Sequence, residues 1–135
     1  MNGLVFLDTS FWIAYRDERQ EQHAAARRIL LDVFRRRQRL VTTFPVICEI
    51  QAYFSRSQPR KAAVLADLWE NPVLTIAETT HQDQIQAIAV LRARPDRSYS
   101  LCDSLSFVVM LRLGLARVLT FDDHFRQFGA FEIVT

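Results

Sequence analysis

The chain has 135 residues, half of them hydrophobic, which is the size of one domain with a substantial core. It contains no apolar stretch long enough for a secretion signal or a membrane span, so we expect a soluble, cytoplasmic single domain over residues 1–135 and no membrane partner. Its two cysteines, Cys48 and Cys102, are too few for a disulfide framework, and no Cys or His pair has the spacing of a zinc site. We expect both thiols to be buried in the core.

The net charge of +2 is unevenly distributed along the chain. Residues 1–61 carry 11 basic and 6 acidic side chains, whereas residues 62–135 carry 6 and 9. Sixteen of the 17 basic residues are arginine, whose planar fork suits phosphate, and those between residues 27 and 39 could follow an RNA backbone. Solvated helix faces explain the same pattern equally well, so charge alone does not identify a nucleic-acid partner.

Strands and helices alternate along the sequence. Residues 4–7 are an unbroken apolar run typical of a buried strand, and Ser10 is a candidate N-cap for a helix over residues 10–16. Apolar runs and helical spacing then predict, in order, a helix over 21–37, a strand over 39–43, helices over 45–55 and 59–69, a strand over 73–77, helices over 81–93 and 100–114, and strands over 117–121 and 131–135. The last of these helices has Ser100 as its candidate N-cap and Gly114 as its candidate C-cap. This alternation predicts an α/β fold with a mostly parallel sheet of about five short strands and helices on both faces.

Acidic residues stand where predicted strands end or where the following helices begin. Asp8 follows the first strand, and Asp122 and Asp123 follow the fourth. Glu49 lies in the first two turns of the helix after the second strand, and Asp103 lies near the start of the helix that leads to the fourth. Because ligands of such sheets bind beyond the carboxyl ends of the strands, we expect these acids on one rim.

Each acid also has a purely structural explanation. Asp8 suits a helix N-cap, and Asp103 suits a first turn, where the helix dipole favours a carboxylate. Asp122 and Asp123 suit a turn. Glu49 is harder to explain, because its neighbours are apolar and a buried unpaired carboxylate is costly. The joint occurrence on one rim favours a shared cause.

A cluster of carboxylates at that rim requires a cation. Two carboxylates about 4 Å apart repel by roughly 4 kcal/mol at an effective dielectric constant of about 20. Hard oxygen ligands select Mg²⁺ or Mn²⁺ over zinc, and such an ion activates water and stabilises charge on a phosphate. The cluster therefore predicts metal-assisted hydrolysis of a phosphodiester. Thr9 and Ser10 are the candidate substrate-binding residues, through their hydroxyls or backbone N–H groups.

Four stretches of the chain resemble the PIN-domain ribonucleases, and most closely the VapC-type toxins of bacterial and archaeal toxin–antitoxin pairs. The stretches are FLDTSFWIA, ICEI, SLCDSLSFVVMLRLGLARVLTFDDHF and GAFEIV, in family order from end to end. The resemblance implies a single three-layer α/β/α PIN domain, endoribonuclease activity on RNA, a homodimer, and inhibition by a cognate antitoxin that covers an apolar groove.

Carried over residue by residue, the resemblance makes Asp8, Glu49, Asp103 and Asp122 the catalytic quartet that binds Mg²⁺ (or Mn²⁺). Asp8 and Asp103 would be the direct ligands. Asp123 departs from the common pattern, in which many relatives have a basic or neutral residue, and this leaves some choice between Asp122 and Asp123 open.

Other residues keep two interpretations. His124 invites a general-base role, although a metal-activated water needs no histidine and the residue equally suits an anchor for a short helix. The aromatic residues of the early helices, among them Tyr53 and Trp69, suit either the core or an exposed groove for a partner.

Two alternative functions remain. A PIN-like module that binds RNA or protein without catalysis is disfavoured by the complete quartet. An aspartyl-phosphate phosphatase or receiver domain is disfavoured because the single lysine, Lys61, is not near the acids in the sequence.

Overall fold

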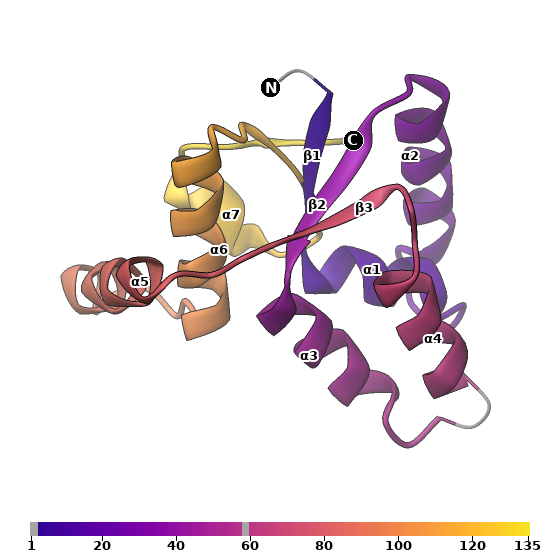
Figure 1. Ribbon diagram of the computed structural model, residues 1–135, viewed down its shortest axis with the longest axis horizontal. Coiled ribbons are helices and arrows are strands. Elements are labelled where there is room, and N and C mark those ends of the chain that lie inside the picture. The colour runs from indigo at the N-terminus through magenta and orange to yellow at the C-terminus, as the bar shows by residue number, and fades with distance from the viewer. Residues whose placement is uncertain (1–2, 58–59) are drawn as a thin grey trace.

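Five short strands form one sheet in the computed structural model, which describes residues 3–57 and 60–135 (Figure 1). In chain order the strands are β1 (Leu4–Leu7), β2 (Arg39–Thr43), β3 (Leu74–Ala77), β4 (Arg117–Leu119) and β5 (Glu132–Ile133). Their order in the sheet is β3-β2-β1-β4-β5, and every neighbouring pair is parallel. β1 is therefore the central strand, with Phe6 opposite Val41 of β2 on one side and Val118 of β4 on the other.

Helices cover both faces of this sheet. Within residues 3–57 and 60–135 they are α1 (Thr9–Arg16), α2 (His23–Arg35), α3 (Phe44–Phe54), α4 (Arg60–Trp69), α5 (His81–Ala93), α6 (Leu101–Leu113) and α7 (Asp123–Phe128). Figure 1 shows α2 and α4 to the right of β1 and β2 and α5 to α7 to the left, with α1 and α3 starting below the lower ends of these strands. The three-layer α/β/α arrangement and the parallel sheet confirm the expected fold class. None of these helices is long and apolar enough to cross a membrane.

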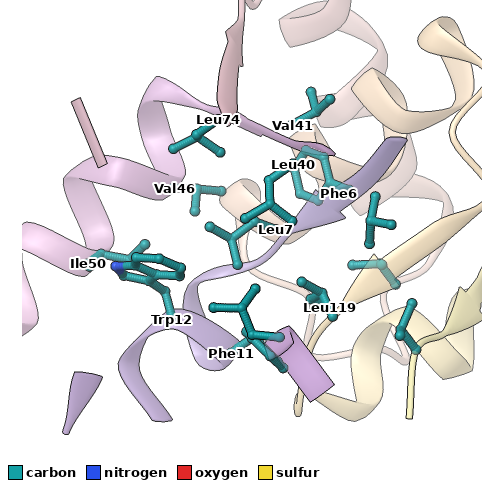
Figure 2. Close-up of a cluster of buried hydrophobic side chains, with 14 of the residues drawn as sticks. Phe6, Leu7, Phe11, Trp12, Leu40, Val41, Val46, Ile50, Leu74 and Leu119 are labelled. Carbon is teal, nitrogen blue, oxygen red and sulfur yellow. The ribbon is translucent and has the colours of Figure 1, made fainter. Parts of the chain in front are cut away.

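The core lies where the strands meet the helices of both layers. Phe6 and Leu7 of β1 are fully buried, as is Phe11 of α1 (Figure 2). Leu40 of β2 and Leu119 of β4 pack beside them on either side. Because burying a side chain of this size contributes roughly 1.5–3 kcal/mol, the central strand and its two neighbours form a rigid base for the residues that follow them.

Helix α6 shows how the sequence defines an element's ends. Ser100 Oγ accepts a hydrogen bond from the Asp103 N–H at 3.0 Å, and the Asp103 side chain accepts one from the Ser100 N–H at 3.0 Å. This capping box satisfies two N–H groups that the first turn would otherwise leave without partners. At the other end Gly114 is the left-handed C-cap, with φ of 69°. Both caps predicted from the sequence are confirmed.

Several expected boundaries are shifted. Ser10 is not the N-cap of α1, because Asp8 occupies that position and its side chain accepts a hydrogen bond from the Ser10 N–H. The helix expected over 21–37 is confined to α2, and the last two strands are shorter than expected. Residue 59, where a helix was expected to begin, lies outside the described residues. Helix α7 has no counterpart among the helix ranges predicted from the sequence.

The expectation that both cysteines lie in the core is wrong. Cys48 is exposed, because the buried face of α3 is formed by Val46, Ile47 and Ile50, and one residue along a helix turns the side chain by about 100°. Cys102 is half-buried beside the acidic residues described below.

Candidate active site

An open cleft of about 520 Å³ lies beyond the carboxyl ends of the strands. Four carboxylates reach it from four segments: Asp8 at the start of α1, Glu49 in α3, Asp103 in the first turn of α6 and Asp122 at the start of α7. The other lining residues are Thr9, Ser10, Ile13, Ala52, Tyr53, Ser100 and His124. The structure therefore brings together all four acids and both hydroxyl residues that the sequence singled out.

Asp8 is the most deeply buried of the four carboxylates, with 4% of its surface exposed. Its Oδ2 accepts hydrogen bonds from Ser10 Oγ at 2.8 Å and from Thr120 Oγ1 at 2.7 Å, and its backbone N–H donates to the Leu119 carbonyl at 3.1 Å. The pKa of Asp8 is raised from 3.8 to about 6: burial is the largest cause, the charge of Asp103 adds to it, and the hydrogen bonds from Thr120 and Ser10 partly offset it. A positive charge in the cleft would remove this penalty.

Asp103 is also buried, and it is linked to a histidine. Its Oδ2 accepts the capping hydrogen bond of Ser100 and lies 2.6 Å from His124 Nδ1. The same Nδ1 lies 3.3 Å from Asp122 Oδ1, and His124 Nε2 is paired with Ser98 Oγ at 3.1 Å. His124 therefore connects the start of α6 with the start of α7.

Asp122, rather than Asp123, faces the cleft. Asp122 is the N-cap of α7: its Oδ1 accepts a hydrogen bond from the His124 N–H at 3.0 Å, and its own N–H donates to Thr120 Oγ1 at 3.0 Å. Asp123 is exposed and does not line the cleft. The geometry thus favours Asp122 where the sequence left the choice open.

Glu49 is exposed, so the cost of a buried charge that the sequence suggested does not arise. Its Oε1 accepts a hydrogen bond of 2.6 Å from Thr9 Oγ1, which fixes the carboxylate across the cleft from α3 to α1. The Cys102 thiol is its neighbour. Burial raises the pKa of that thiol, and the Glu49 carboxylate raises it further, so Cys102 stays protonated at neutral pH.

The oxygen donors of the cleft fit a hard divalent cation. One ligand atom each from Asp103, Asp122 and His124 lie within 4.8 Å of one another. Hydrogen bonds within the described chain engage only Oδ2 of Asp103 and only Oδ1 of Asp122, and the side-chain donors on Asp8 reach only Oδ2. The other carboxylate oxygen of Asp103 and of Asp122 accepts no hydrogen bond within the described chain, so it is available to a cation such as Mg²⁺ or Mn²⁺.

No arginine or lysine lines the cleft in the part of the chain that the structure describes. Arg35, Arg36 and Arg37 end α2 or follow it directly, and Arg39 begins β2, which places them at the amino edge of the sheet, opposite the acids. Arg27 and Arg28 line a separate pocket, so the idea that the arginines between residues 27 and 39 follow RNA bound at the acidic rim is not supported.

The family model of the PIN domain matches residues 5–130, a range that includes all four acids. The chain belongs to the PIN-domain family. Curated relatives of this PIN domain include the 23S rRNA-specific endonuclease VapC20 from two strains of Mycobacterium tuberculosis, CDC 1551 and H37Rv. Each is 28% identical over 131 residues, a stretch that covers 96% of this chain and 98% of the relative.

Solved structures share the fold. The crystal structure of Mycobacterium tuberculosis VapC20, described as a sarcin–ricin loop cleaving toxin, matches with a TM-score of 0.85 and 26% identity, covering 97% of this chain and 99% of that one. VapBC2 from Rickettsia felis, bound to a DNA fragment from its promoter, matches with a TM-score of 0.65 and 12% identity, covering 96% of both chains. The second likeness concerns the PIN fold alone.

The sequence did not reveal the contacts of three residues that lie in or beside the PIN-domain cleft. Thr120 was read only as part of a strand, yet its hydroxyl contacts Asp8. His124 was left as an optional base or anchor, yet it contacts two of the acids. Tyr53 carried a detectable signal, because it lies four residues after Glu49 and so shares its face of α3.

Proposed function

We propose that this protein is a VapC-type endoribonuclease toxin that hydrolyses RNA phosphodiesters with Mg²⁺ or Mn²⁺ held by Asp8, Glu49, Asp103 and Asp122. The observation that carries the proposal is the convergence of these four carboxylates, from four separate segments, in one cleft without a lining Arg or Lys among the described residues. A cation relieves the repulsion within such a concentration of negative charge, and a divalent cation held by carboxylate oxygens suits phosphodiester chemistry.

The relatives indicate which RNA to test first. VapC20 of Mycobacterium tuberculosis is named a 23S rRNA-specific endonuclease, and its structure is that of a sarcin–ricin loop cleaving toxin. The similarity to this chain extends over 96% of its length rather than over an isolated motif. We therefore propose the sarcin–ricin loop of 23S rRNA as the first substrate for this protein.

When bound, the cation would activate a water for attack on phosphorus and stabilise the charge that develops on the phosphate oxygens. The protein's own part is to hold its ligands in place. Ser10 and Thr120 orient Asp8 from two sides, and Thr9 orients Glu49. The hydroxyls of Thr9 and Ser10 are engaged by the site's own carboxylates. We therefore assign the substrate contact of these two residues to the start of α1, where the helix dipole favours the anionic RNA backbone.

His124 has a positioning role in this scheme. Its ring lies against the carboxylates of Asp103 and Asp122, and its backbone N–H also binds Asp122. It therefore keeps the acids of α6 and α7 at a constant separation through Oδ2 of Asp103 and Oδ1 of Asp122.

The test compares two acids inside the cleft with one outside it. Purified protein free of antitoxin is incubated with 23S rRNA fragments that contain the sarcin–ricin loop, in Mg²⁺, in Mn²⁺ or in a chelator. We expect cleavage only with a metal ion, and a loss of roughly 100-fold or more in Asp8→Asn and Asp103→Asn, because the ion stabilises the transition state by several kcal/mol. Asp123→Asn is the matched control and should cleave like the wild type. Equal activity in all three variants would remove the proposed site.

Protein partners form the second part of the proposal. An apolar groove of about 500 Å³ between α3 and α4, lined by Phe44, Leu65 and Trp69, suits an apolar segment of a cognate antitoxin. Exposed Ile85 and Ile88 of α5 suit a homodimer interface. Sedimentation of the isolated chain, and of the chain with the product of a neighbouring antitoxin gene, measures both associations.

A PIN-like module that binds RNA without cutting it is the alternative. The presence of all four acids in one cleft argues against it, since a binding module gains nothing from a cluster that repels phosphate. RNA binding without cleavage in either metal ion would favour this alternative.

A further inference from the structure

Tyr53 is an aromatic residue of the acidic cleft that the proposed reaction does not use. It lies in α3 and lines the cleft together with Glu49 and Ala52 of the same helix. The residue is 43% exposed, although a tyrosine gains from burying its ring. An aromatic side chain with this much exposed surface inside a cleft is available to a bound molecule.

The hydroxyl of Tyr53 is fixed from behind by a buried carboxylate. It donates a hydrogen bond of 2.7 Å to Asp17 Oδ2 and accepts one of 3.0 Å from Gln20 Nε2. Asp17 is fully buried and also accepts hydrogen bonds from the Arg19 guanidinium at 2.9 and 3.0 Å. Hydrogen bonds from Arg19 and Tyr53 keep the pKa of Asp17 far below its usual value, so this acceptor stays charged.

The ring itself is held against a buried neighbour. Phe54, which is fully buried, packs edge to face on Tyr53 with ring centroids 4.9 Å apart. With the hydroxyl tied to Asp17 and one part of the ring on Phe54, the remaining ring surface is left for the cleft. Little side-chain freedom is therefore lost when a flat group docks on it.

We propose that Tyr53 is a stacking platform for a nucleobase of single-stranded RNA next to the scissile phosphate. This rests on the proposed function, because it assigns a role to the same cleft. No arginine or lysine of the described residues lines the cleft, so the lining itself offers the RNA backbone no lysine or arginine charge. Stacking supplies affinity that does not depend on charge, and it tolerates any base because every base has a π face.

The test measures base-dependent binding without cleavage. In an Asp8→Asn background with Mg²⁺, fluorescence anisotropy compares the Kd of a 12-nucleotide oligo(A) with that of a 12-mer of the same ribose-phosphate backbone without bases. We expect the background protein to prefer oligo(A), and Tyr53→Ala to reduce that preference by roughly 5- to 100-fold. Tyr53→Trp and Tyr53→Phe, which keep an aromatic ring, should retain the preference to within about threefold.

Two further measurements separate stacking from a structural role. Tyr53→Phe removes the hydrogen bond to Asp17 and should lower Tm while leaving base preference intact. Phe34→Ala removes an aromatic residue that is 38% exposed on α2, outside the cleft, and should leave base preference unchanged.

The proposal is overturned if Tyr53→Ala keeps the base preference, if Phe34→Ala loses it equally, or if the background protein binds neither oligonucleotide or both alike. Failure of the proposed function looks different. In that case the wild-type protein would cut no RNA in either metal ion, while base preference that depends on Tyr53 would still be measured.

Discussion

Replacing Asp8 with asparagine should make the metal-free protein more stable at neutral pH, although it should abolish RNA cleavage. The pKa of Asp8 rises from 3.8 to about 6 on folding, chiefly because the carboxylate is buried. A tenfold change in a proton equilibrium is worth about 1.4 kcal/mol, so ionised Asp8 costs about 3 kcal/mol relative to its protonated form. Asparagine is neutral, is as good an N-cap as aspartate, and can accept the hydrogen bonds of Ser10 and Thr120 through its Oδ1.

The sign of the pH dependence follows from the raised pKa. Below pH 3.8 Asp8 is protonated in both the folded and the unfolded chain, so its burial carries no charge penalty. As pH rises from about 4 to about 6, the unfolded chain loses this proton first, and the wild type loses stability that Asp8→Asn keeps. We therefore expect Asp8→Asn to exceed the wild type by about 1–3 kcal/mol at pH 7.5, and the difference to vanish near pH 4.

Urea denaturation of both proteins in a chelator, followed by circular dichroism between pH 4 and pH 8, measures this difference. A variant that is less stable than the wild type at every pH would refute the reasoning, because it would mean that the carboxylate is stabilising in its buried position. Adding Mg²⁺ should reverse the order. An ion at 100 times its Kd stabilises the folded state by about 2.7 kcal/mol, and the wild type should gain more of this than Asp8→Asn.

Three further substitutions test the surroundings of the site and the fold. Thr120→Val removes a hydroxyl that donates to Asp8, so we expect RNA cleavage to slow by roughly tenfold and stability to fall by about 1–2 kcal/mol. Unchanged initial rates of cleavage would contradict the role of Thr120 in positioning Asp8. Gly114→Ala places a side chain at φ of 69° with open space around it, and a calorimetric Tm should fall by a few degrees, for a strain of about 1 kcal/mol. Arg112→Met leaves the buried Asp83 carboxylate without its two hydrogen bonds of 2.9 Å from Arg112. Urea denaturation should show a free energy of unfolding lower by about 1–3 kcal/mol, at the lower end because the Arg112 side chain is 40% exposed. An Arg112→Met protein as stable as the wild type would show that this pair is replaceable.

The fold could be predicted because helices on both sides of a parallel sheet force its strands to be continuously apolar. Residues 4–7 show this, and β1 has the predicted bounds. The ends of the helices and strands were harder to predict from the sequence. β4 stops at Leu119 because Thr120 turns toward Asp8, and no local pattern reports that contact. Helix α7 has only six residues, which is less than two turns and too short to show a repeating apolar pattern, and it depends on the Asp122 cap and the buried Phe125.

The four acids could be predicted because topology alone places them at one edge of the sheet. Their partners could not, because they come from distant parts of the chain: Thr120 is 112 residues from Asp8. The cysteines show the same limit. Helix geometry correctly turns Cys102 away from the direction of Asp103, but it does not reveal that Glu49 of α3 lies on that side. The local sequence pattern predicts the position of a residue on its helix or strand, but only tertiary packing determines which residues its side chain contacts.

The central position of β1 has a consequence for how the chain folds. β1 is the first strand in the sequence, yet one of its edges is paired only when β4 docks, more than a hundred residues later. Until then that edge exposes unsatisfied N–H and C=O groups flanked by apolar side chains, which invites association with other chains. The same docking step delivers Thr120 and Asp122 to the cleft. Refolding at high concentration should therefore lose material to aggregates, and nuclease activity should appear together with the final tertiary contacts, which leaves partly folded chains harmless to the cell's RNA.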